Sequence, residues 1–579
     1  MDDLVERARL WSLLETDPEG RRALLDAVAA AERGDRTALV DLVDGRLRFG
    51  TAGLRGPLGP GPRRLNVVVA EQTAAGIARV LLDDVADAAS RGVLVGRDGR
   101  HGSAAMAAAA EAVFRAHGLA VAGFDGPVPT PLVASTLAHG DAAAAIVVTA
   151  SHNPAADNGI KVYWADGAQI VAPLDARIAA EIDRAAAEVA AAVAAEPDDP
   201  IAAAHRVVRP GPGSAPRTDL GTSSTGPAAD AYVERALVGV HPRSTVPLAL
   251  TSMHGVGADL LERLLRAAGH DDLHVVAEQR DPDPDFPTVA FPNPEEPGAL
   301  DRLVDVAAGA GCAAGLANDP DADRLALVVP DGHGAWRALT GDEVGAVLCH
   351  HLLERDAAGA PDARTPLVAT TVVSSQLAGA IARAAGAHAV ETLTGFKWLC
   401  RPAMEHPEWR QVLAYEEALG YAVGPDARDK DGITAALAVA DLVAGLAADG
   451  RTVLDLLDDL HRRHGAHVTR NGWTTLAGPD AAEVLSTFVR RLADAPLDEI
   501  DGRPVVHRDR PAPDVLRMWT DDGTRLAIRP SGTEPKLKHY CEAVVAVDGD
   551  GPEALAAARA EAGRRADGVV AAVGVLLGG

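Results

Sequence analysis

Residues 142–154 read AAAAIVVTASHNP, and the chain returns a few residues later as Ile160-Lys161-Val162-Tyr163-Trp164. The uninterrupted apolar run 142–148 is typical of a buried strand, and the second run predicts another short strand. The polar, turn-forming residues between them place Ser151 on a loop between two strands. A rigid scaffold would hold this hydroxyl and leave it able to react, which makes Ser151 a candidate nucleophile.

The alternation of helical and extended patterns around this loop predicts α/β layering. A helical pattern near 70–90 precedes the strand-like run 92–95, and a second helical pattern follows near 103–117. This alternation of helices and strands is typical of sheets covered by helices. We predict four domains, the first ending in a partly disordered linker (196–227): residues 1–227, 228–338, 339–465 and 466–579.

Composition narrows the class of protein. The chain has 579 residues, of which 47% are hydrophobic and only 3% aromatic, and its formal net charge is −27. Such acidity argues against nucleic acid or an anionic membrane as the main partner. The four cysteines lack CxxC spacing, so we expect them to be reduced. No signal-peptide pattern and no apolar stretch of roughly 18 residues is found, which favours a soluble, cytoplasmic protein without a membrane partner.

An acidic loop follows the apolar run 313–317, at the end of a strand, where α/β proteins gather ligands. Its sequence, DPDADR (319–324), puts three carboxylates at alternating positions, so that all three can face one cation. Hard oxygen ligands favour Mg²⁺ or Ca²⁺, and a phosphorylated Ser151 would add a further oxygen. A calcium EF-hand is excluded because Arg324 and Pro330 stand where that loop needs Gly and Glu. The alternative is a solvated acidic turn.

Further loops carry groups that suit a phosphosugar. The run RPSGTEPKLK (529–538) offers one Arg, two hydroxyls and two Lys, which can cradle a phosphate dianion. The run YEEALGY (415–421) carries paired carboxylates that can accept hydrogen bonds from sugar hydroxyls. Cations also occur in TGFKW (394–398), in DKDG (429–432) and in the Gly-rich run FGTAGLRG (49–56), which predicts a loop. A basic surface turn and a solvated acidic face are the alternatives for the first two.

Other reaction templates do not fit the sequence. It contains no GxSxG and no GxxxxGK[ST], and the run 49–56 is not GxGxxG and does not follow a strand. Without a nucleotide site, the phosphoryl group would come from the sugar itself and return to it.

As a set, these motifs resemble those of the α-D-phosphohexomutase superfamily, in particular its phosphoglucomutase/phosphopentomutase branch. The resemblance runs from about Phe49 to Glu542. The family's phosphoserine, metal, sugar and phosphate loops are similar, in that order, to TASHNP (149–154), DPDADR (319–324), EEALGY (416–421) and RPSGTEPKLK (529–538). The resemblance implies four domains around a central cleft, namely three related mixed α/β domains and a C-terminal α+β domain.

The resemblance also implies a reaction and a set of site residues. Phospho-Ser151 would form a bisphosphate with the sugar monophosphate and take back its other phosphoryl group, which interconverts glucose 1-phosphate and glucose 6-phosphate. Mg²⁺ would be the cofactor and glucose 1,6-bisphosphate an activator. The implied metal ligands are Ser151, Asp319, Asp321 and Asp323. The implied catalytic residues are Ser151, His152, Lys161 and Arg324. The implied substrate-binding residues are Thr51, Arg55, Lys397, Glu416, Lys430, Arg529, Ser531, Gly532, Thr533 and Lys538.

One position departs from the family's pattern. Much of the family has Ser after the glutamate pair, whereas this chain has Ala418. The lost hydroxyl removes a potential hydrogen bond to the sugar, worth about 0.5–1.5 kcal/mol. This departure leaves the preferred sugar open, so phosphopentomutase and phosphomannomutase activity are alternatives. Two further alternatives do not depend on Ala418: a metal-dependent phosphatase that uses the same serine and aspartates, and a non-catalytic phosphosugar sensor. A monomer or small homo-oligomer is expected.

Overall fold

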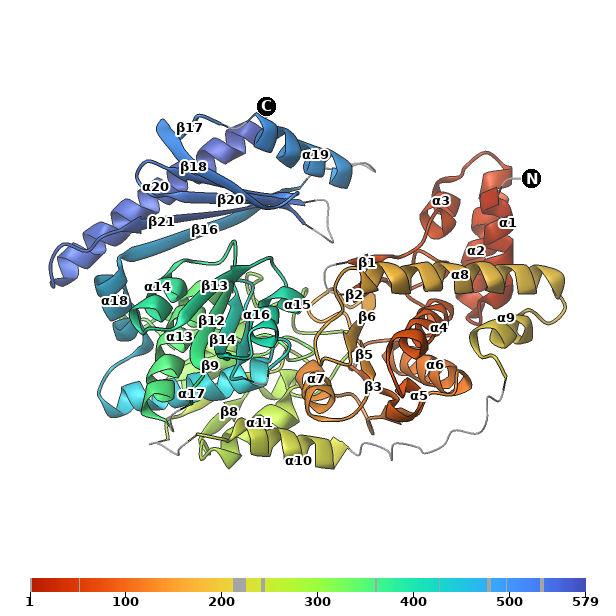
Figure 1. The fold of residues 1–579 in the computed structure, drawn as a ribbon, viewed down its shortest axis with the longest axis horizontal. Coiled ribbons are helices and arrows are strands. Elements are labelled where there is room, and N and C mark those ends of the chain that lie inside the picture. Colours follow the sequence, from red (N-terminus) through yellow and green to blue (C-terminus); the bar gives the residue numbers. More distant parts are fainter. Residues whose placement is uncertain are drawn as a thin grey trace. The chain divides into compact units, whose positions relative to one another are not determined.

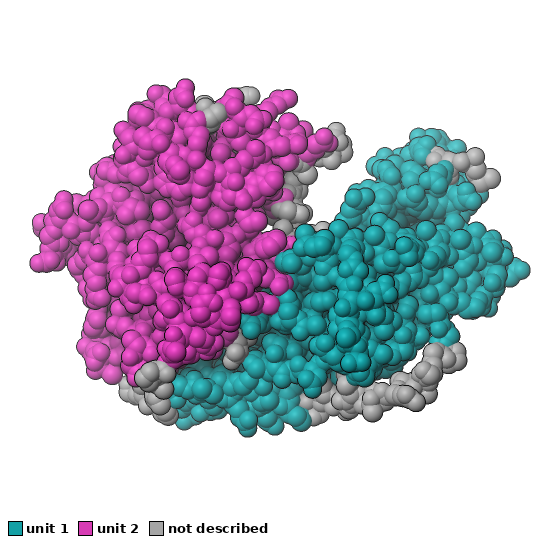
Figure 2. Space-filling view, in the orientation of Figure 1, with its two compact units in different colours: residues 1–242, 247–325, 427–437 teal, residues 243–246, 326–426, 438–579 magenta. Residues whose placement is uncertain are grey.

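The computed structural model divides into two compact units (Figures 1 and 2). The first unit holds residues 1–242, 247–325 and 427–437, and the second holds residues 243–246, 326–426 and 438–579. The structure describes residues 3–50, 53–211, 225–240, 245–359, 362–425, 427–475, 481–495, 497–531 and 536–578. The short segment 427–437 belongs to the first unit although the chain on both sides of it belongs to the second.

The sheet that carries Ser151 is the centre of the first unit. Its strand order is β1-β2-β6-β5-β3-β4, in which β3 runs parallel to β4 and β5 and the other neighbours are antiparallel. All residues of β5 are buried, as expected for an apolar strand in the middle of a sheet. The strands are β1 (Phe49–Gly50), β2 (Gly53–Pro57), β3 (Val93–Arg97), β4 (Val121–Gly123), β5 (Ala144–Val148) and β6 (Asp157–Trp164).

Helices with apolar faces pack around this sheet. α6 and α7 contact β3 and β5, and α4 packs against α6 and α8. A core of mostly aliphatic side chains joins these elements, which explains how the unit folds with few aromatic residues. The helices are α1 (Asp3–Leu14), α2 (Pro18–Glu32), α3 (Thr37–Val43), α4 (Val67–Asp84), α5 (Ala88–Arg91), α6 (Ser103–Ala116), α7 (Thr130–His139), α8 (Leu174–Ala195) and α9 (Pro200–Val208).

Two segments that the sequence predicts as linker and loop contain regular structure. Residues 200–208, inside the predicted linker, form α9, because Pro200 suits a first helical turn and apolar side chains on one face are buried. The Gly-rich run 49–56 supplies β1 and most of β2. Gly53 permits this, since its φ is +90° and a Cβ there would lie 2.4 Å from the carbonyl oxygen of Ile160.

A smaller parallel arrangement completes the first unit. β7 lies between β8 and β9 and runs parallel to both, and the acidic loop 319–323 follows the end of β9. The elements are α10 (Thr225–Ala236), β7 (Leu248–Thr251), α11 (Ala258–Ala267), β8 (Leu273–Val275), the 3₁₀ turn Ala277–Gln279, α12 (Asp301–Ala310) and β9 (Ala314–Ala317).

The second unit contains a four-stranded sheet in the order β13-β12-β14-β15, of which only β15 is antiparallel to its neighbour. β10 and β11 form an antiparallel pair. The elements are β10 (Ala326–Pro330), β11 (Trp336–Ala338), α13 (Gly341–Ala358), β12 (Thr365–Thr371), α14 (Leu377–Ala384), β13 (His388–Thr392), α15 (Phe396–Leu399), α16 (Arg401–Glu405), β14 (Trp409–Glu416), β15 (Gly420–Val423), α17 (Gly432–Ala448, its first turns in the first unit) and α18 (Val453–His464). Within the described residues no single helix is long and apolar enough to cross a membrane, whereas α17 and α18, bent by 91°, reach that length and composition as a pair.

An antiparallel sheet with the order β16-β21-β20-β19-β18-β17 forms the C-terminal part of the second unit. α20 runs along β16 and β21 (Figure 1), and α19 contacts β20, so both helices share an apolar core with the sheet. The elements are β16 (Ala466–Thr475), α19 (Ala481–Asp494), β17 (Glu499–Ile500), β18 (Arg503–Ala512), β19 (Val515–Thr520), β20 (Arg525–Pro530), β21 (Lys536–Val545) and α20 (Pro552–Gly578).

Candidate active site

Ser151 lies on the loop between β5 and β6, as the sequence predicts. It is 1% exposed and has a left-handed backbone with a φ of +53°, which few residues other than glycine adopt. Its hydroxyl donates to Asp319 Oδ2 at 2.6 Å, and its backbone N–H donates to Thr149 Oγ1 at 2.9 Å. An unusual local conformation therefore aims the hydroxyl at the acidic loop.

The three aspartates of the acidic loop meet at one buried point. Their carboxylate oxygens lie within 4.8 Å of one another, and each residue is at most 1% exposed. Lys161 Nζ donates to Asp321 Oδ2 at 2.7 Å and to Asp323 Oδ2 at 2.6 Å. The second oxygens, Asp321 Oδ1 and Asp323 Oδ1, are buried and have no hydrogen-bond partner among the described residues. Buried carboxylate oxygens of this kind are costly unless a cation pairs with them, so this donor set fits a hard divalent ion such as Mg²⁺.

The pKa values of Asp319 and Asp323 are shifted in opposite directions by their surroundings. Burial, together with the neighbouring Asp323 and Asp321, raises the pKa of Asp319 to about 7. Burial would also raise the pKa of Asp323, but Lys161 and other nearby cations lower it below its usual range. Asp323 is thus a fixed anion at neutral pH, whereas Asp319 exchanges its proton there.

His152 lies between Ser151 and Arg324. Its Nδ1 lies 3.1 Å from Ser151 Oγ, and its Nε2 lies 3.5 Å from Arg324 Nη2. Burial, followed by the positive charges of Arg324 and Arg55, lowers the pKa of His152 well below its ordinary value. The imidazole is therefore neutral. Because the serine hydroxyl donates to Asp319, we assign the proton to Nδ1, which donates to Ser151 Oγ.

The segment 427–437 brings a further cation to the triad. Lys430 Nζ lies 3.3 Å from Asp323 Oδ2. The preceding Asp429 accepts hydrogen bonds from Tyr163 Oη at 2.6 Å and Gln169 Nε2 at 2.7 Å, which ties the segment to β6 and the turn after it. The DKDG motif, whose Lys430 the family resemblance implies as a substrate-binding residue, therefore lies beside the acidic loop within the first unit.

Several residues around the triad escaped the sequence analysis. Thr130 Oγ1 donates to Asp321 Oδ2 at 2.8 Å, and Thr149 Oγ1 donates to the same oxygen at 3.2 Å. Arg100 holds the backbone of the serine loop. Their partners lie 51–191 positions away along the chain. No local pattern signals such contacts, although the adjacency of Thr149 to Ser151 is visible in the sequence.

The glutamate pair, Glu416 and Glu417, lies near Arg529 in the second unit. Glu417 accepts hydrogen bonds from Thr371 Oγ1 at 3.2 Å and Ser374 Oγ at 3.1 Å, so its carboxylate holds the turn after β14 in place. Burial would lower the pKa of Arg529, but Tyr540, Glu417 and Glu416 raise it. The opposite charges of Arg529 and the glutamate pair therefore act on one another directly.

Strands β20 and β21, which flank the phosphate-type loop (the run 529–538), place basic side chains on one face of the sheet. Arg529 on β20 pairs with Lys538 on β21, and Lys538 pairs with Trp473 on β16. Directly opposed residues point to the same face of a sheet. Lys536 Nζ also lies 5.1 Å from the centre of the Trp473 ring, so an aromatic side chain accompanies this row of positive charge.

The structure thus separates the predicted site residues into two groups. Those in the first unit are Arg55, Ser151, His152, Lys161, Asp319, Asp321, Asp323, Arg324 and Lys430; those in the second are Lys397, Glu416, Arg529, Ser531 and Lys538. Lys397 lies on α15, with Nζ 5.9 Å from the centroid of the Trp398 ring. The backbone N–H of Ser531 donates to the backbone carbonyl oxygen of Lys536 at 2.7 Å. Thr51, Gly532 and Thr533 lie outside the described residues.

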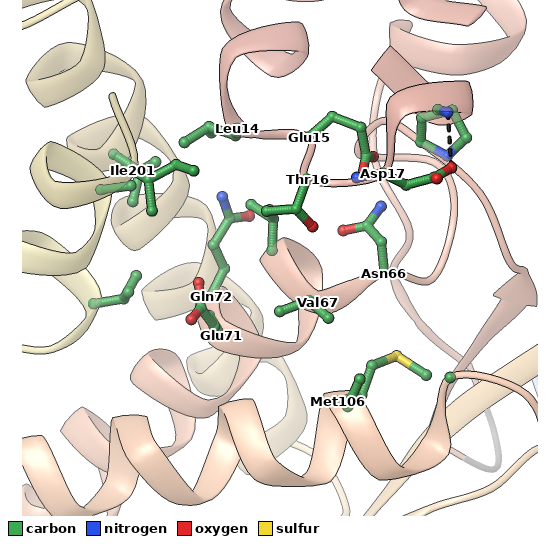
Figure 3. Close-up of a pocket in the computed structure, with 18 of the residues that line it drawn as sticks. Leu14, Glu15, Thr16, Asp17, Asn66, Val67, Glu71, Gln72, Met106 and Ile201 are labelled. Atoms are coloured by element: carbon green, nitrogen blue, oxygen red, sulfur yellow. Dashed lines mark hydrogen bonds between the residues drawn. The ribbon is translucent and has the colours of Figure 1, made fainter. Parts of the chain in front are cut away.

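A separate cavity of about 460 Å³ lies in the first unit among α1, α4, α6 and α9 (Figure 3). Apolar side chains such as Leu14, Val67, Met106 and Ile201 line much of it. None of the described site residues contributes to its lining. This cavity is therefore distinct from the cluster around Ser151.

Family models match four successive parts of the chain. Three are described as the α/β/α domains I, II and III of phosphoglucomutase/phosphomannomutase and the fourth as its C-terminal domain, at residues 46–188, 230–332, 340–464 and 488–562. The chain belongs to the α-D-phosphohexomutase superfamily. Its members are phosphotransferase isomerases, and the predicted enzyme class and four-domain mixed α/β fold of this phosphohexomutase are confirmed.

Relatives of this phosphohexomutase carry several substrate names. A probable phosphomannomutase of Haemophilus influenzae is 36% identical over 83% of this chain and 93% of its own length. A probable phosphoribomutase of Schizosaccharomyces pombe is 33% identical over 92% of each chain, and a phosphoglucomutase of Staphylococcus aureus is 30% identical over 86% of this chain and 89% of its own. A solved family protein of Burkholderia thailandensis shares the fold, with a TM-score of 0.64 and 22% identity over 90% of this chain and 96% of its own.

Proposed function

We propose that this phosphohexomutase is a Mg²⁺-dependent phosphosugar mutase that carries the transferred phosphoryl group on Ser151. The hydrogen bond of 2.6 Å from Ser151 Oγ to Asp319, within a cluster of three buried carboxylates, carries the proposal. A serine with no role in phosphoryl transfer would gain nothing from a left-handed backbone that presents its hydroxyl to a cation site.

The residues of the first unit have separate tasks in this proposal. Asp319, Asp321 and Asp323 hold Mg²⁺ together with an oxygen of phospho-Ser151. The ion supplies Lewis-acid stabilisation of the transferring phosphoryl group when bound. Lys161 neutralises part of the negative charge of Asp321 and Asp323 through its hydrogen bonds to one oxygen of each.

His152 and the basic side chains act on the nucleophile and on the bound phosphate. The neutral imidazole of His152 donates to Ser151 Oγ and so stabilises negative charge that develops on that oxygen. Arg324, Arg55 and Lys430 supply positive charge around the triad. This local field offsets the strongly acidic character of the chain as a whole.

The residues of the second unit bind the remainder of the substrate. Glu416 accepts hydrogen bonds from sugar hydroxyls. The phosphate that is not transferred is held by side chains and amides of the phosphate-type loop and by cations near it: Arg529, Ser531, Gly532, Thr533, Lys538 and Lys397, with Thr51 assisting from the Gly-rich run. Charge-assisted hydrogen bonds from Arg and Lys are well suited to a phosphate dianion.

We propose glucose 1-phosphate and glucose 6-phosphate as the first substrate pair and glucose 1,6-bisphosphate as the activator. A pentose phosphate is the second candidate, favoured by two observations. Ala418 offers one hydrogen-bonding group fewer to the sugar, and relatives named phosphopentomutase (mouse) and probable phosphoribomutase cover 94% and 92% of this chain.

The test is a competition followed by ³¹P NMR. One tube holds the protein, Mg²⁺, a trace of glucose 1,6-bisphosphate and equal amounts of glucose 1-phosphate, mannose 1-phosphate and ribose 1-phosphate, and a parallel tube holds Ser151→Ala. We expect glucose 1-phosphate to be converted fastest and the variant to be inactive. Faster conversion of the ribose ester assigns a phosphopentomutase. Release of inorganic phosphate alone, or full activity in Ser151→Ala, contradicts the proposed reaction.

A further inference from the structure

One buried arginine, Arg100, donates hydrogen bonds to several backbone carbonyl groups of the serine loop, residues 149–156 between β5 and β6. Arg100 follows β3, and its side chain is 1% exposed. Its Nη2 donates to the carbonyl oxygens of Ser151, at 2.6 Å, and Asn153. Its Nη1 donates to the carbonyl oxygens of Pro154 at 2.7 Å and Asp157 at 3.2 Å. Three carbonyl groups of the loop and that of the first residue of β6 therefore converge on a single guanidinium.

The arginine is itself fixed from two sides. Asp98 Oδ2 lies 3.4 Å from Arg100 Nε, and Asp98 Oδ1 accepts hydrogen bonds from the backbone N–H of Arg100 at 2.9 Å and from Ser103 Oγ at 2.6 Å. The ring of Phe286 covers the guanidinium, with its centroid 4.8 Å from Cζ. Phe286 belongs to the Pro- and Asp-rich segment between the 3₁₀ turn Ala277–Gln279 and α12, and it is 4% exposed.

The geometry points to Arg100 as a positioning residue for the nucleophile, an inference that rests on the proposed role of Ser151. The carbonyl group of Ser151 is buried and needs a donor, and the hydrogen bonds to Asn153, Pro154 and Asp157 are partly buried. The left-handed backbone of Ser151 is also unfavourable on its own and needs surrounding contacts to persist. Thr149 takes the N–H of Ser151 and Arg100 takes its carbonyl group, so both sides of the nucleophile are fixed.

The guanidinium group of arginine is suited to donating hydrogen bonds to four carbonyl groups at once. Its five N–H donors lie in one plane and diverge like a fork, which suits four carbonyl groups at different positions. A lysine at the same place has three donors on one atom and cannot reach all four. Arg100→Lys therefore preserves the charge and removes the geometry, which separates positioning from electrostatics.

The experiment measures phosphoryl transfer from glucose 1,6-bisphosphate to the full-length protein in Mg²⁺, by rapid quench and intact-mass spectrometry. We expect Arg100→Lys to form the phosphoenzyme about 10²-fold more slowly, since a misplacement of about 1 Å costs that much in rate. The KM for the sugar monophosphate and the midpoint for Mg²⁺ binding to the unphosphorylated protein should stay within about threefold of wild type. Before Ser151 carries a phosphoryl group, the proposed ligands of Mg²⁺ are the three aspartates of the acidic loop, and the sugar is proposed to bind to other loops. Arg115→Lys on α6, whose arginine makes a half-exposed ion pair with Glu111, is the matched control and should behave as wild type.

The outcomes separate this inference from the proposed function. A transfer rate in Arg100→Lys within about threefold of wild type, with Ser151→Ala inactive, overturns the positioning role alone. Transfer that persists in Ser151→Ala overturns the proposed function instead. A parallel loss of Mg²⁺ binding in a folded Arg100→Lys also contradicts positioning. If circular dichroism shows that Arg100→Lys does not fold, Phe286→Leu decides: we expect about tenfold slower transfer without the cation–π contact, and an unchanged rate overturns the inference.

Discussion

Replacing Lys161 by Met should destabilise the first unit strongly, and Mg²⁺ should relieve part of the loss. Lys161 is 1% exposed and pairs with two carboxylates that are themselves at most 1% exposed, at 2.7 and 2.6 Å. Removing one partner of a buried ion pair costs about 3–5 kcal/mol, because the remaining charge is left without compensation. We expect a loss of that size in the presence of a chelator.

Mg²⁺ should reduce this loss because the proposed Mg²⁺ site uses the same carboxylates. An ion present at about 100 times its dissociation constant stabilises the folded state by about 2.7 kcal/mol. Without the competing ammonium group, the variant should bind the ion more tightly than wild type. We therefore expect the destabilisation by Lys161→Met to be at least about 1 kcal/mol smaller in saturating Mg²⁺ than in chelator.

Hydrogen exchange read at the amides of β5 and β6 provides the free energies of opening for both proteins under both conditions. Arg115→Met, which removes a half-exposed ion pair on α6, is the control and should cost less than about 1 kcal/mol. A loss below about 1 kcal/mol for Lys161→Met in chelator would refute the buried ion pair as described. An equal loss with and without Mg²⁺ would refute the shared site.

Three further predictions concern other parts of the chain. Burial and the nearby Arg559 lower the pKa of His461 to about 3 in the folded state. Because the unfolded chain binds this proton near pH 6.5, the free energy of unfolding should fall as the pH drops below that value, by about 2 kcal/mol at pH 5. Urea unfolding of wild type and His461→Gln at pH 7 and pH 5 should show this loss in wild type and not in the variant. Gly432→Ala places a Cβ 2.1 Å from the carbonyl oxygen of Arg324, so it should lower kcat about 10²-fold by shifting the segment 427–437, and steady-state kinetics with an unchanged kcat would contradict this. Ala418→Ser adds one hydroxyl to the loop 416–421 and should improve kcat/KM for glucose 1-phosphate relative to ribose 1-phosphate by about 2- to 10-fold. An unchanged ratio would show that residue 418 does not contact the sugar.

Local patterns in the sequence predicted the serine loop well. The apolar run before Ser151 is too short for a helix and too apolar for a surface strand, so its period and length alone indicated β5. The alternating aspartates of the acidic loop also needed no long-range knowledge, because three carboxylates two residues apart can converge from one loop. Both expectations are met in the structure.

Two predictions from amino-acid composition were wrong because tertiary packing determines the local structure there. Residues 200–208 follow a Pro- and Asp-rich run and were predicted as linker, yet their apolar face is buried and they form α9. The run 49–56 has the glycine content of a loop, but Gly53 allows β2 to pass close to β6. Glycine marks close approach of two backbones as readily as it marks a turn.

Long-range contacts lay beyond the sequence analysis. Arg100 binds a loop that begins about 50 residues later, and Asp429 binds Tyr163 across 266 positions. Such pairs depend on how β3, β5 and β6 are ordered in the sheet and on where the segment 427–437 folds back. Neither feature has a local signal in hydrophobic period or turn composition.

The most direct test of the central claim is the mass of the protein after incubation with Mg²⁺ and glucose 1,6-bisphosphate, with the modified residue located by fragmentation. The account predicts that wild type gains one phosphoryl group, that the group lies on Ser151, and that it is lost again when excess glucose 1-phosphate is added. A phosphoryl group on another residue, or mutase turnover in Ser151→Ala, would contradict the account.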